Sequence, residues 1–221
     1  MFAVKIDMEQ ARFNMIEQQI RPWEVLDPEV LGVLAVVKRE DFVPATHRAL
    51  AFADLELPIG NGQTMLQPKV DARVLQEVGL RSTDIVLEVG TGSGYMAALL
   101  AAKAEYVHSV EIDPVLAETA RRNLRQAGVA NVSVETGDAS QGWSGSAPYD
   151  AIVISGALPE LPEAFLQQLK PGGRLVAFIG EPPVMEARLI TRTDDKAFNT
   201  INLFETVVAP LRNKQRQRFV F

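Results

Sequence analysis

The chain has 221 residues, which is enough for one sizeable domain and too few for two of ordinary size. Its net charge of −6 argues against nonspecific binding to nucleic acid, which depends on clustered lysine and arginine, so we expect no nucleic-acid partner. The hydrophobic content of 47% is typical of a globular protein, and the absence of cysteine excludes disulfides, thiolate metal sites and cysteine nucleophiles.

The N-terminal part of the chain is predicted to be helical. Residues 1–7 lack the apolar core of a signal peptide, and no apolar run in the chain is long enough to cross a bilayer, so we expect a cytoplasmic protein without a membrane partner. Apolar residues at three- and four-residue steps predict a helix over 7–20, which Arg21-Pro22 ends. A second helix over 27–37 and a third segment over 42–52 complete an expected helical cap.

A segment rich in glycine and proline follows the cap. Residues 57–68 contain too many of both for a regular element and too many apolar residues for a solvated loop, so we expect an irregular loop that lines a binding site. A helix is predicted over 70–78. We therefore expect one domain, in which residues 1–79 form the cap and the substrate-side loop and residues 80–221 form the core.

The core alternates strands with helices. Strands are predicted at 85–89, 106–111, 132–135, 151–155 and 174–179, and helices at 95–104, 114–127 and 162–169. This alternation predicts an α/β fold with a mostly parallel sheet and helices on both faces. Segments 187–192 and 201–208 are predicted to form an antiparallel hairpin at one edge, which is the arrangement of methyltransferases.

The first predicted strand of the core ends in alternating glycines, Gly90-Thr91-Gly92-Ser93-Gly94. Such a loop brings backbone N–H groups close to a ligand. Dinucleotide-binding loops read G-x-G-x-x-G, whereas this loop reads G-x-G-x-G, with Tyr95 at the place of their third glycine. With Glu88 before it, the loop resembles that of class I, Rossmann-like methyltransferases, so we expect S-adenosylmethionine as cofactor. A nucleotide-dependent dehydrogenase and a purely structural turn are the alternatives.

Side chains after the next two strands complete the predicted cofactor site, because ligands of doubly wound sheets lie at the carboxyl ends of the strands. Glu111 can accept hydrogen bonds from both ribose hydroxyls of a nucleoside; the alternative is a glutamate that faces solvent. Asp138 can accept a hydrogen bond from the adenine amino group, with Ile112 or Ala139 beside the ring. The alternative for Asp138 is an aspartate that caps a turn.

The fourth strand ends at Ser155-Gly156-Ala157, where methyltransferases hold the methyl acceptor. The Asn/Asp-Pro-Pro-aromatic tetrapeptide of enzymes that methylate amino groups is absent there, and the lack of cysteine excludes carbon methylation by a cysteine nucleophile. No side chain is obviously placed to deprotonate an alcohol, although Glu160 is near. An acceptor that is already an anion, such as a carboxylate, needs no general base.

The remaining charged groups give no further site. The histidines, His47 and His108, are far apart and lack metal-ligand spacing, so we expect no metal. Four basic residues near the C-terminus are interpreted as a solvated tail rather than as a nucleic-acid site: Arg212, Lys214, Arg216 and Arg218.

Segments along the whole chain together resemble one family, the protein-L-isoaspartate (D-aspartate) O-methyltransferases. The segments are MIEQQIR at 15–21, REDFVP at 39–44, LPIG at 57–60, GQT at 62–64, QP at 67–68, VLEVGTGSGY at 86–95 and LKPGGR at 169–174. The glycine loop and the Pro-Gly-Gly stretch are shared with many methyltransferases, whereas the N-terminal segment and the Gly-Gln-Thr loop are more specific.

The resemblance implies methyl transfer from S-adenosylmethionine to the misplaced α-carboxylate of an isoaspartyl residue in a protein or peptide, with S-adenosylhomocysteine as the product. The ester then closes to a succinimide that reopens partly to normal aspartate. On that analogy Thr64-Met65-Leu66-Gln67 lies over the methionine end of the cofactor, Ile59-Gly60 and Ser155-Gly156-Ala157 border the peptide, and the tail 210–217 closes over the site.

The sequence departs from the family pattern at two positions. The family loop reads Gln-Thr-Ile-Ser, and its serine hydroxyl is the nearest group to a catalytic side chain, whereas this chain has Leu66 there, with Thr64 nearby. A missing charge-assisted hydrogen bond of about 1.5–3 kcal/mol corresponds to a loss of roughly ten- to a hundredfold. The usual Gly-Asp-Gly is changed to Gly137-Asp138-Ala139.

Three interpretations of the function follow, and none of them assigns a catalytic side chain. The first is repair of isoaspartyl residues. The second is the same scaffold with another acceptor, such as a small-molecule carboxylate. The third is a non-catalytic protein that binds S-adenosylmethionine or S-adenosylhomocysteine.

Overall fold

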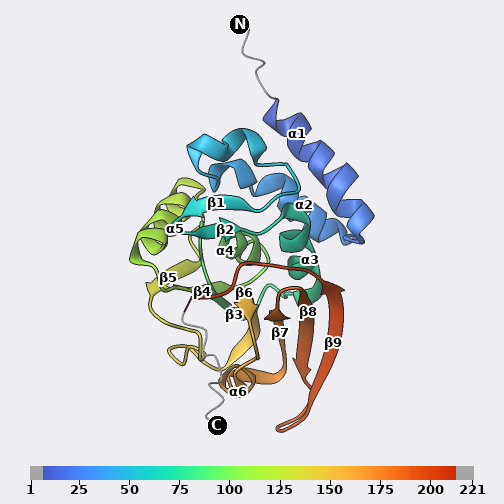
Figure 1. The fold of residues 1–221 in the computed structure, drawn as a ribbon. Coiled ribbons are helices and arrows are strands. Elements are labelled where there is room, and N and C mark those ends of the chain that lie inside the picture. The colour runs from blue at the N-terminus through green and yellow to red at the C-terminus, as the bar shows by residue number, and fades with distance from the viewer. Residues whose placement is uncertain (1–6, 213–221) are drawn as a thin grey trace, which may run out of the picture.

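The structure of the protein is a computed structural model that describes residues 7–212 (Figure 1). The strands of its main sheet are β3 (Ile85–Val89), β4 (Tyr106–Glu111), β5 (Val132–Thr136), β6 (Tyr149–Leu158), β7 (Leu169–Glu181), β8 (Val184–Arg192) and β9 (Phe198–Glu205). They lie in the order β5-β4-β3-β6-β7-β8-β9. Neighbours from β5 to β7 pair in parallel, and β8 and β9 pair antiparallel. The predicted parallel sheet with a hairpin at its edge is confirmed.

The two faces of the sheet are covered differently. Successive strand residues point to opposite faces, so Val86 packs into one hydrophobic cluster and Leu87 into the other. The first cluster contains residues of the N-terminal cap and of α3 (Pro68–Val78), α4 (Tyr95–Ala101) and α5 (Pro114–Gln126). The second contains residues of α6 (Glu163–Gln167) and of the segment 139–149.

The N-terminal cap lies over the first cluster. It contains α1 (Met8–Met15), a π-helical turn η1 (Ile16–Ile20), α2 (Pro28–Val36) and the 3₁₀ turns η2 (Arg21–Trp23), η3 (Arg39–Asp41) and η4 (Ala45–Leu50). The predicted helix over 7–20 corresponds to α1 followed by η1, which ends at Ile20 before Arg21-Pro22. The short turn η2 then leads to Glu24, whose φ is 62°. The third predicted segment, 42–52, contains the 3₁₀ turn η4 rather than an α-helix.

The prediction of an irregular loop over 57–68 is wrong. Residues 57–65 form an antiparallel hairpin of β1 (Leu57–Gly60) and β2 (Gln63–Met65). Asn61 and Gly62, at its turn, have φ of 51° and 72°. Asn-Gly is the dipeptide that favours a two-residue hairpin turn, because both residues tolerate positive φ. The high glycine and proline content of the segment is typical of a loop, and it outweighs the Asn-Gly signal for a hairpin when only composition is considered.

A buried arginine joins the cap to the segment after the hairpin. Arg39 is fully buried, and its guanidinium donates hydrogen bonds to Asp71 Oδ2 (2.5 Å), to the Ala51 carbonyl (3.0 Å) and to the Leu66 carbonyl (2.5 Å). It also lies 5.0 Å from the centre of the Tyr95 ring. Within residues 7–212 no helix has the length and apolar character required to span a membrane.

Candidate active site

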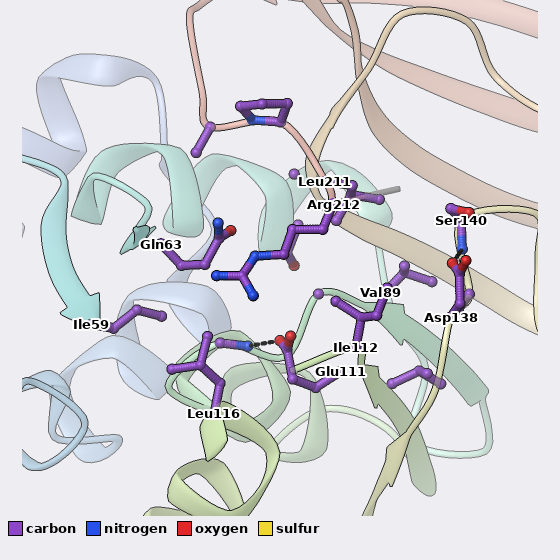
Figure 2. Close-up of a pocket in the computed structure, with 18 of the residues that line it drawn as sticks. Ile59, Gln63, Val89, Glu111, Ile112, Leu116, Asp138, Ser140, Leu211 and Arg212 are labelled. Carbon is purple, nitrogen blue, oxygen red and sulfur yellow. Dashed lines mark hydrogen bonds between the residues drawn. The ribbon is translucent and has the colours of Figure 1, made fainter. Parts of the chain in front are cut away.

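A cavity opens at the carboxyl ends of β3, β4 and β6, below the β1–β2 hairpin and beside the last described residues (Figure 2). The predicted site residues that line it are Ile59, Thr64, Leu66, Gly90, Gly92, Glu111, Ile112, Asp138, Ala139, Ser155 and Gly156. An adjoining cavity shares several of these and adds Met65, Glu88, Thr91 and Ser93. The strands, the hairpin and the glycine loop therefore bring most of the predicted residues together.

Four predicted residues lie outside the lining of these two cavities: Gly60, Gln67, Gly94 and Ala157. Gly94 has a φ of 87° and precedes α4, and a Cβ there would lie 3.3–3.4 Å from Leu124 and Ala120 of α5. It therefore serves helix packing. Gln67 is the residue before α3, and Ala157 is paired through its backbone.

The glycine loop requires glycine for two reasons. Gly90 and Gly92 have φ of 91° and 53°, a region that other residues rarely adopt. A Cβ on Gly90 would lie 3.0 Å from the Leu211 side chain, and one on Gly92 would lie 3.0 Å from Ile59. The Gly92 N–H donates to Glu111 Oε2 (2.8 Å), so the loop is held against the end of β4 (Figure 2).

Glu111 is buried at the floor of the cavity. Its Oε2 accepts the Gly92 N–H, and its Oε1 accepts the N–H of Asp113 (3.0 Å). The alternative of a glutamate that faces solvent is thus wrong. An ionised carboxylate has about four acceptor positions, so these two bonds leave acceptor capacity.

Asp138 caps a turn and also lines the cavity. Its Oδ1 accepts the N–H of Ser140 (2.9 Å), which is the bond of an aspartate that caps a turn. The same residue lines the cavity, together with Ile112 and Ala139 (Figure 2).

Glu88 lies beneath the glycine loop in a network of hydroxyl groups. Its carboxyl group is fully buried and accepts hydrogen bonds from Ser109 Oγ (2.6 Å) and Ser155 Oγ (3.3 Å). Thr91 Oγ1 lies 2.5 Å from Ser109 Oγ and extends the network to the loop. Burial raises the pKa of Glu88 to about 8, which the two serine bonds oppose and the nearby Glu111 and Asp71 reinforce. Burial thus favours the protonated form of Glu88.

This protonation predicts a pH dependence of stability. In the unfolded chain Glu88 ionises near its ordinary pKa of 4.5, but in the folded chain only near 8. The folded state binds the extra proton between these values, so the contribution of Glu88 to the free energy of unfolding falls as pH rises through that window. We expect the decrease to reach a few kcal/mol, since each pKa unit corresponds to about 1.4 kcal/mol.

The measurement is urea unfolding of the wild type and of Glu88→Gln at pH 5, 6.5 and 8. Glutamine resembles the protonated acid, so the variant should lose less stability as pH rises. Asp71, whose pKa burial raises to about 7, is present in both proteins, so its own titration contributes to both profiles. Parallel stability profiles of the two proteins would contradict the buried, protonated state.

Residues 209–212, which we call the strap, form one wall of the cavity. The Ala157 N–H donates to the Ala209 carbonyl (2.9 Å), and the Leu211 N–H donates to the Ala157 carbonyl (3.0 Å). A Cβ on Gly156 would lie 2.9 Å from the Leu211 side chain, so glycine is needed there for room. Of the tail expected to close over the site, residues 210–212 line the cavity and residues 213–217 lie outside the described residues.

Arg212 lines the cavity, as the resemblance implies for the tail 210–217, and does not lie in a solvated tail as its basic neighbours indicate. Its Nη1 donates to Asp113 Oδ2 (2.8 Å). Its Nη2 donates to the Asn61 carbonyl. The other members of the basic run, Lys214, Arg216 and Arg218, lie outside the described residues. The Asn-Gly pair was the available signal for a turn that presents Asn61; the ion pair itself has no local signal.

Comparison with known proteins identifies the family. The family model described as protein-L-isoaspartate(D-aspartate) O-methyltransferase matches residues 10–216. A Methanoculleus marisnigri protein named protein-L-isoaspartate O-methyltransferase is 48% identical over 76% of this chain and 77% of its own. One of the same name from Koribacter versatilis is 40% identical over 92% of this chain and 91% of its own.

Solved structures agree with this result. A structure named protein-L-isoaspartate O-methyltransferase has a TM-score of 0.78 at 27% identity, over 92% of this chain and 65% of that chain. A Plasmodium falciparum protein in complex with S-adenosyl-L-homocysteine has the same TM-score at 19% identity, over 94% of this chain and 99% of that one, which shows likeness of fold alone. The chain belongs to the protein-L-isoaspartate (D-aspartate) O-methyltransferase family, whose cofactor is S-adenosylmethionine.

Proposed function

We propose that the protein transfers the methyl group of S-adenosylmethionine to the α-carboxylate of L-isoaspartyl residues in damaged proteins. The observation that carries this proposal is the cavity at the strand ends, in which the glycine loop, Glu111 and Asp138 face the hairpin and the strap. We treat residues 1–221 as a single methyltransferase domain with its boundary between cap and core at 79/80, acting in the cytoplasm and without a nucleic-acid partner.

The residues of the cavity suit the cofactor. Gly90 and Gly92 leave room where a Cβ would meet Leu211 and Ile59, so backbone groups can approach a ligand closely. Glu111 has acceptor capacity for ribose hydroxyls, and Asp138 can accept from an adenine amino group flanked by Ile112 and Ala139. When bound, S-adenosylmethionine supplies an electrophilic methyl group on a sulfonium. We propose that the segment 64–67 covers the methionine end of the cofactor. The opposite side is formed by the glycine loop, including Thr91, Ser93 and Gly94, with Glu88 beneath it.

The acceptor side is formed by the hairpin and the end of β6. Ile59, Gly60, Ser155, Gly156 and Ala157 are proposed to border the peptide. A carboxylate is already a nucleophile, so these residues need only align its oxygen with the methyl group, an effect worth up to about 7–11 kcal/mol. Leu66 favours a second candidate, a small-molecule carboxylate with an apolar portion, because its side chain is buried at the boundary of both cavities.

The proposed function is tested with radiolabelled S-adenosylmethionine and an isoaspartyl peptide, beside the same peptide with a normal aspartyl residue. We expect base-labile label on the isoaspartyl peptide alone. Absence of label, together with cofactor binding by calorimetry, would contradict isoaspartyl repair. That result would leave another acceptor or a non-catalytic binding role.

We expect Glu111→Ala to weaken S-adenosylhomocysteine binding by about 1–3 kcal/mol, because it removes a charged acceptor and leaves the Gly92 N–H without its partner. Isothermal titration calorimetry measures the effect. Glu105→Ala, at an exposed position directly before β4, is the matched control and should bind as the wild type does. Unchanged affinity of Glu111→Ala would remove the ribose assignment.

A further inference from the structure

The cavity contains a cation whose role the proposed function leaves open. Among the described residues that line the cavity, Arg212 is the only one with a positively charged side chain, whereas Glu111 and Asp138 are acidic. Its side chain reaches from the strap across the cavity toward Gln63, above Glu111 (Figure 2). The proposed methyl acceptor is an anion, and Leu66 cannot donate a hydrogen bond to it. The cavity thus pairs an anionic acceptor with one cationic side chain.

The guanidinium keeps donors for a further partner. Its Nη1 donates to Asp113 Oδ2 (2.8 Å) and its Nη2 donates to the Asn61 carbonyl. An arginine has five N–H donors in a planar fork that matches a carboxylate. Within residues 7–212 these two hydrogen bonds therefore leave three N–H groups for a ligand.

Asp113 is the fixed member of this ion pair. Its Oδ1 accepts the N–H groups of Val115 (2.9 Å) and Leu116 (3.3 Å) at the start of α5, and Asn61 Nδ2 donates to its Oδ2 (2.9 Å). Although burial opposes its ionisation, the hydrogen bonds from Asn61, the two helix amides and Arg212 lower the pKa of Asp113. Three of these hydrogen bonds, from Asn61, Val115 and Leu116, do not involve Arg212 and hold the carboxylate in place independently of it.

Arg212 is the more exposed member of the pair: its side chain is 37% exposed, against 8% for Asp113. It extends from the strap, which the Leu211 N–H attaches to Ala157. If a ligand oxygen takes the place of Asp113 Oδ2, Arg212 replaces one ion pair by another. Asp113 then keeps its hydrogen bonds from Asn61, Val115 and Leu116.

We propose that Arg212 binds the carboxylate of the methyl acceptor and determines the preference for an anionic acceptor, an inference that rests on the proposed function. The guanidinium binds one carboxylate oxygen and leaves the other free to form the O–CH₃ bond, while the methyl–sulfur bond breaks and its electron pair stays on sulfur. No proton moves in this step. Arg212 thereby supplies the charge-assisted hydrogen bond that Leu66 cannot give.

The test compares the KM of an isoaspartyl peptide for the wild type, Arg212→Gln, Arg212→Lys and Asp113→Asn at saturating S-adenosylmethionine. We expect Arg212→Gln to raise KM about ten- to a hundredfold, since a charge-assisted hydrogen bond is lost. Cofactor affinity by calorimetry should stay within about twofold of the wild type. Arg212→Lys should recover part of the effect, because it keeps the charge without the fork.

Asp113→Asn separates acceptor binding from a purely structural role. Asparagine keeps an oxygen for the start of α5 but loosens the hold on Arg212, so KM should fall below the wild-type value. If the ion pair served only to hold the strap, Asp113→Asn and Arg212→Gln would both raise KM, and the proposal would be overturned.

A binding readout complements the kinetics. The same peptide with its isoaspartyl α-carboxylate converted to an amide is used as a competitive inhibitor. The wild type should bind the acid much more tightly than the amide, and Arg212→Gln should bind the two alike. If the wild type methylates the isoaspartyl peptide but Arg212→Gln keeps the wild-type KM and preference, the Arg212 inference fails and the proposed function stands. If the wild type transfers no methyl group to the peptide, the proposed function fails and the acceptor role fails with it.

Discussion

Replacing Arg39 by methionine is expected to lower the free energy of unfolding by about 3–5 kcal/mol, the range observed when one partner of a buried ion pair is removed. Methionine fills much of the space but leaves Asp71 without its cation and the carbonyls of Ala51 and Leu66 without their donor. Burial already raises the pKa of Asp71 to about 7, against the lowering effect of Arg39. Without Arg39 that pKa rises further, so the loss of stability should be larger at pH 8 than at pH 5.

Urea unfolding of Arg39→Met at these two pH values measures the effect. The double variant Arg39→Met with Asp71→Asn is the control, because it removes both charges and should recover a large part of the loss at pH 8. A loss below about 1 kcal/mol in the single variant would show that the ion pair contributes no more than an exposed one.

Replacing Leu66 by serine is expected to raise kcat/KM for an isoaspartyl peptide about ten- to a hundredfold, as a hydroxyl near the acceptor carboxylate contributes about 1.5–3 kcal/mol. The Leu66 side chain is buried where both cavities meet, and the Arg39 guanidinium fixes its carbonyl. The backbone that carries the new hydroxyl is therefore held in place.

Initial-rate measurements with the peptide test this expectation. Leu66→Ala is the matched control, since it removes the same bulk without adding a hydroxyl. An equal gain in kcat/KM in both variants would show that the removal of the leucine side chain, and not a new hydrogen bond, causes the effect. No gain in Leu66→Ser would mean that this position lies away from the acceptor carboxylate.

The sheet could be predicted from the sequence because its signals are local. The apolar runs of β3 and β4 are bounded by turn residues and acids, and both predicted ranges agree with the structure. The hairpin has conflicting local signals: its glycine and proline content indicates a loop, whereas the two-residue turn at Asn61-Gly62 indicates paired strands.

Some residues of the site could likewise be predicted from local patterns in the sequence, and others could not. Glu111, Asp138 and Ser155 could be placed together because parallel strands end at one edge of the sheet. Arg39 and Arg212 could not, since their partners Asp71 and Asn61 lie 32 and 151 positions away in the chain. The three carbonyl partners and the two carboxylates are brought to these arginines only by the tertiary fold.

The strap also affects how the protein reaches its native state. The contact between Arg212 and Asn61 closes a loop of 151 positions, and contacts of such separation tend to form late because of the entropy of closing long loops. An intermediate that already has the sheet but not the strap would present an open groove in place of a cavity. Ligand affinity is therefore a property of the completed fold. A ligand that contacts both the glycine loop and the strap would slow hydrogen exchange at the Leu211 amide by stabilising the closed state against local opening.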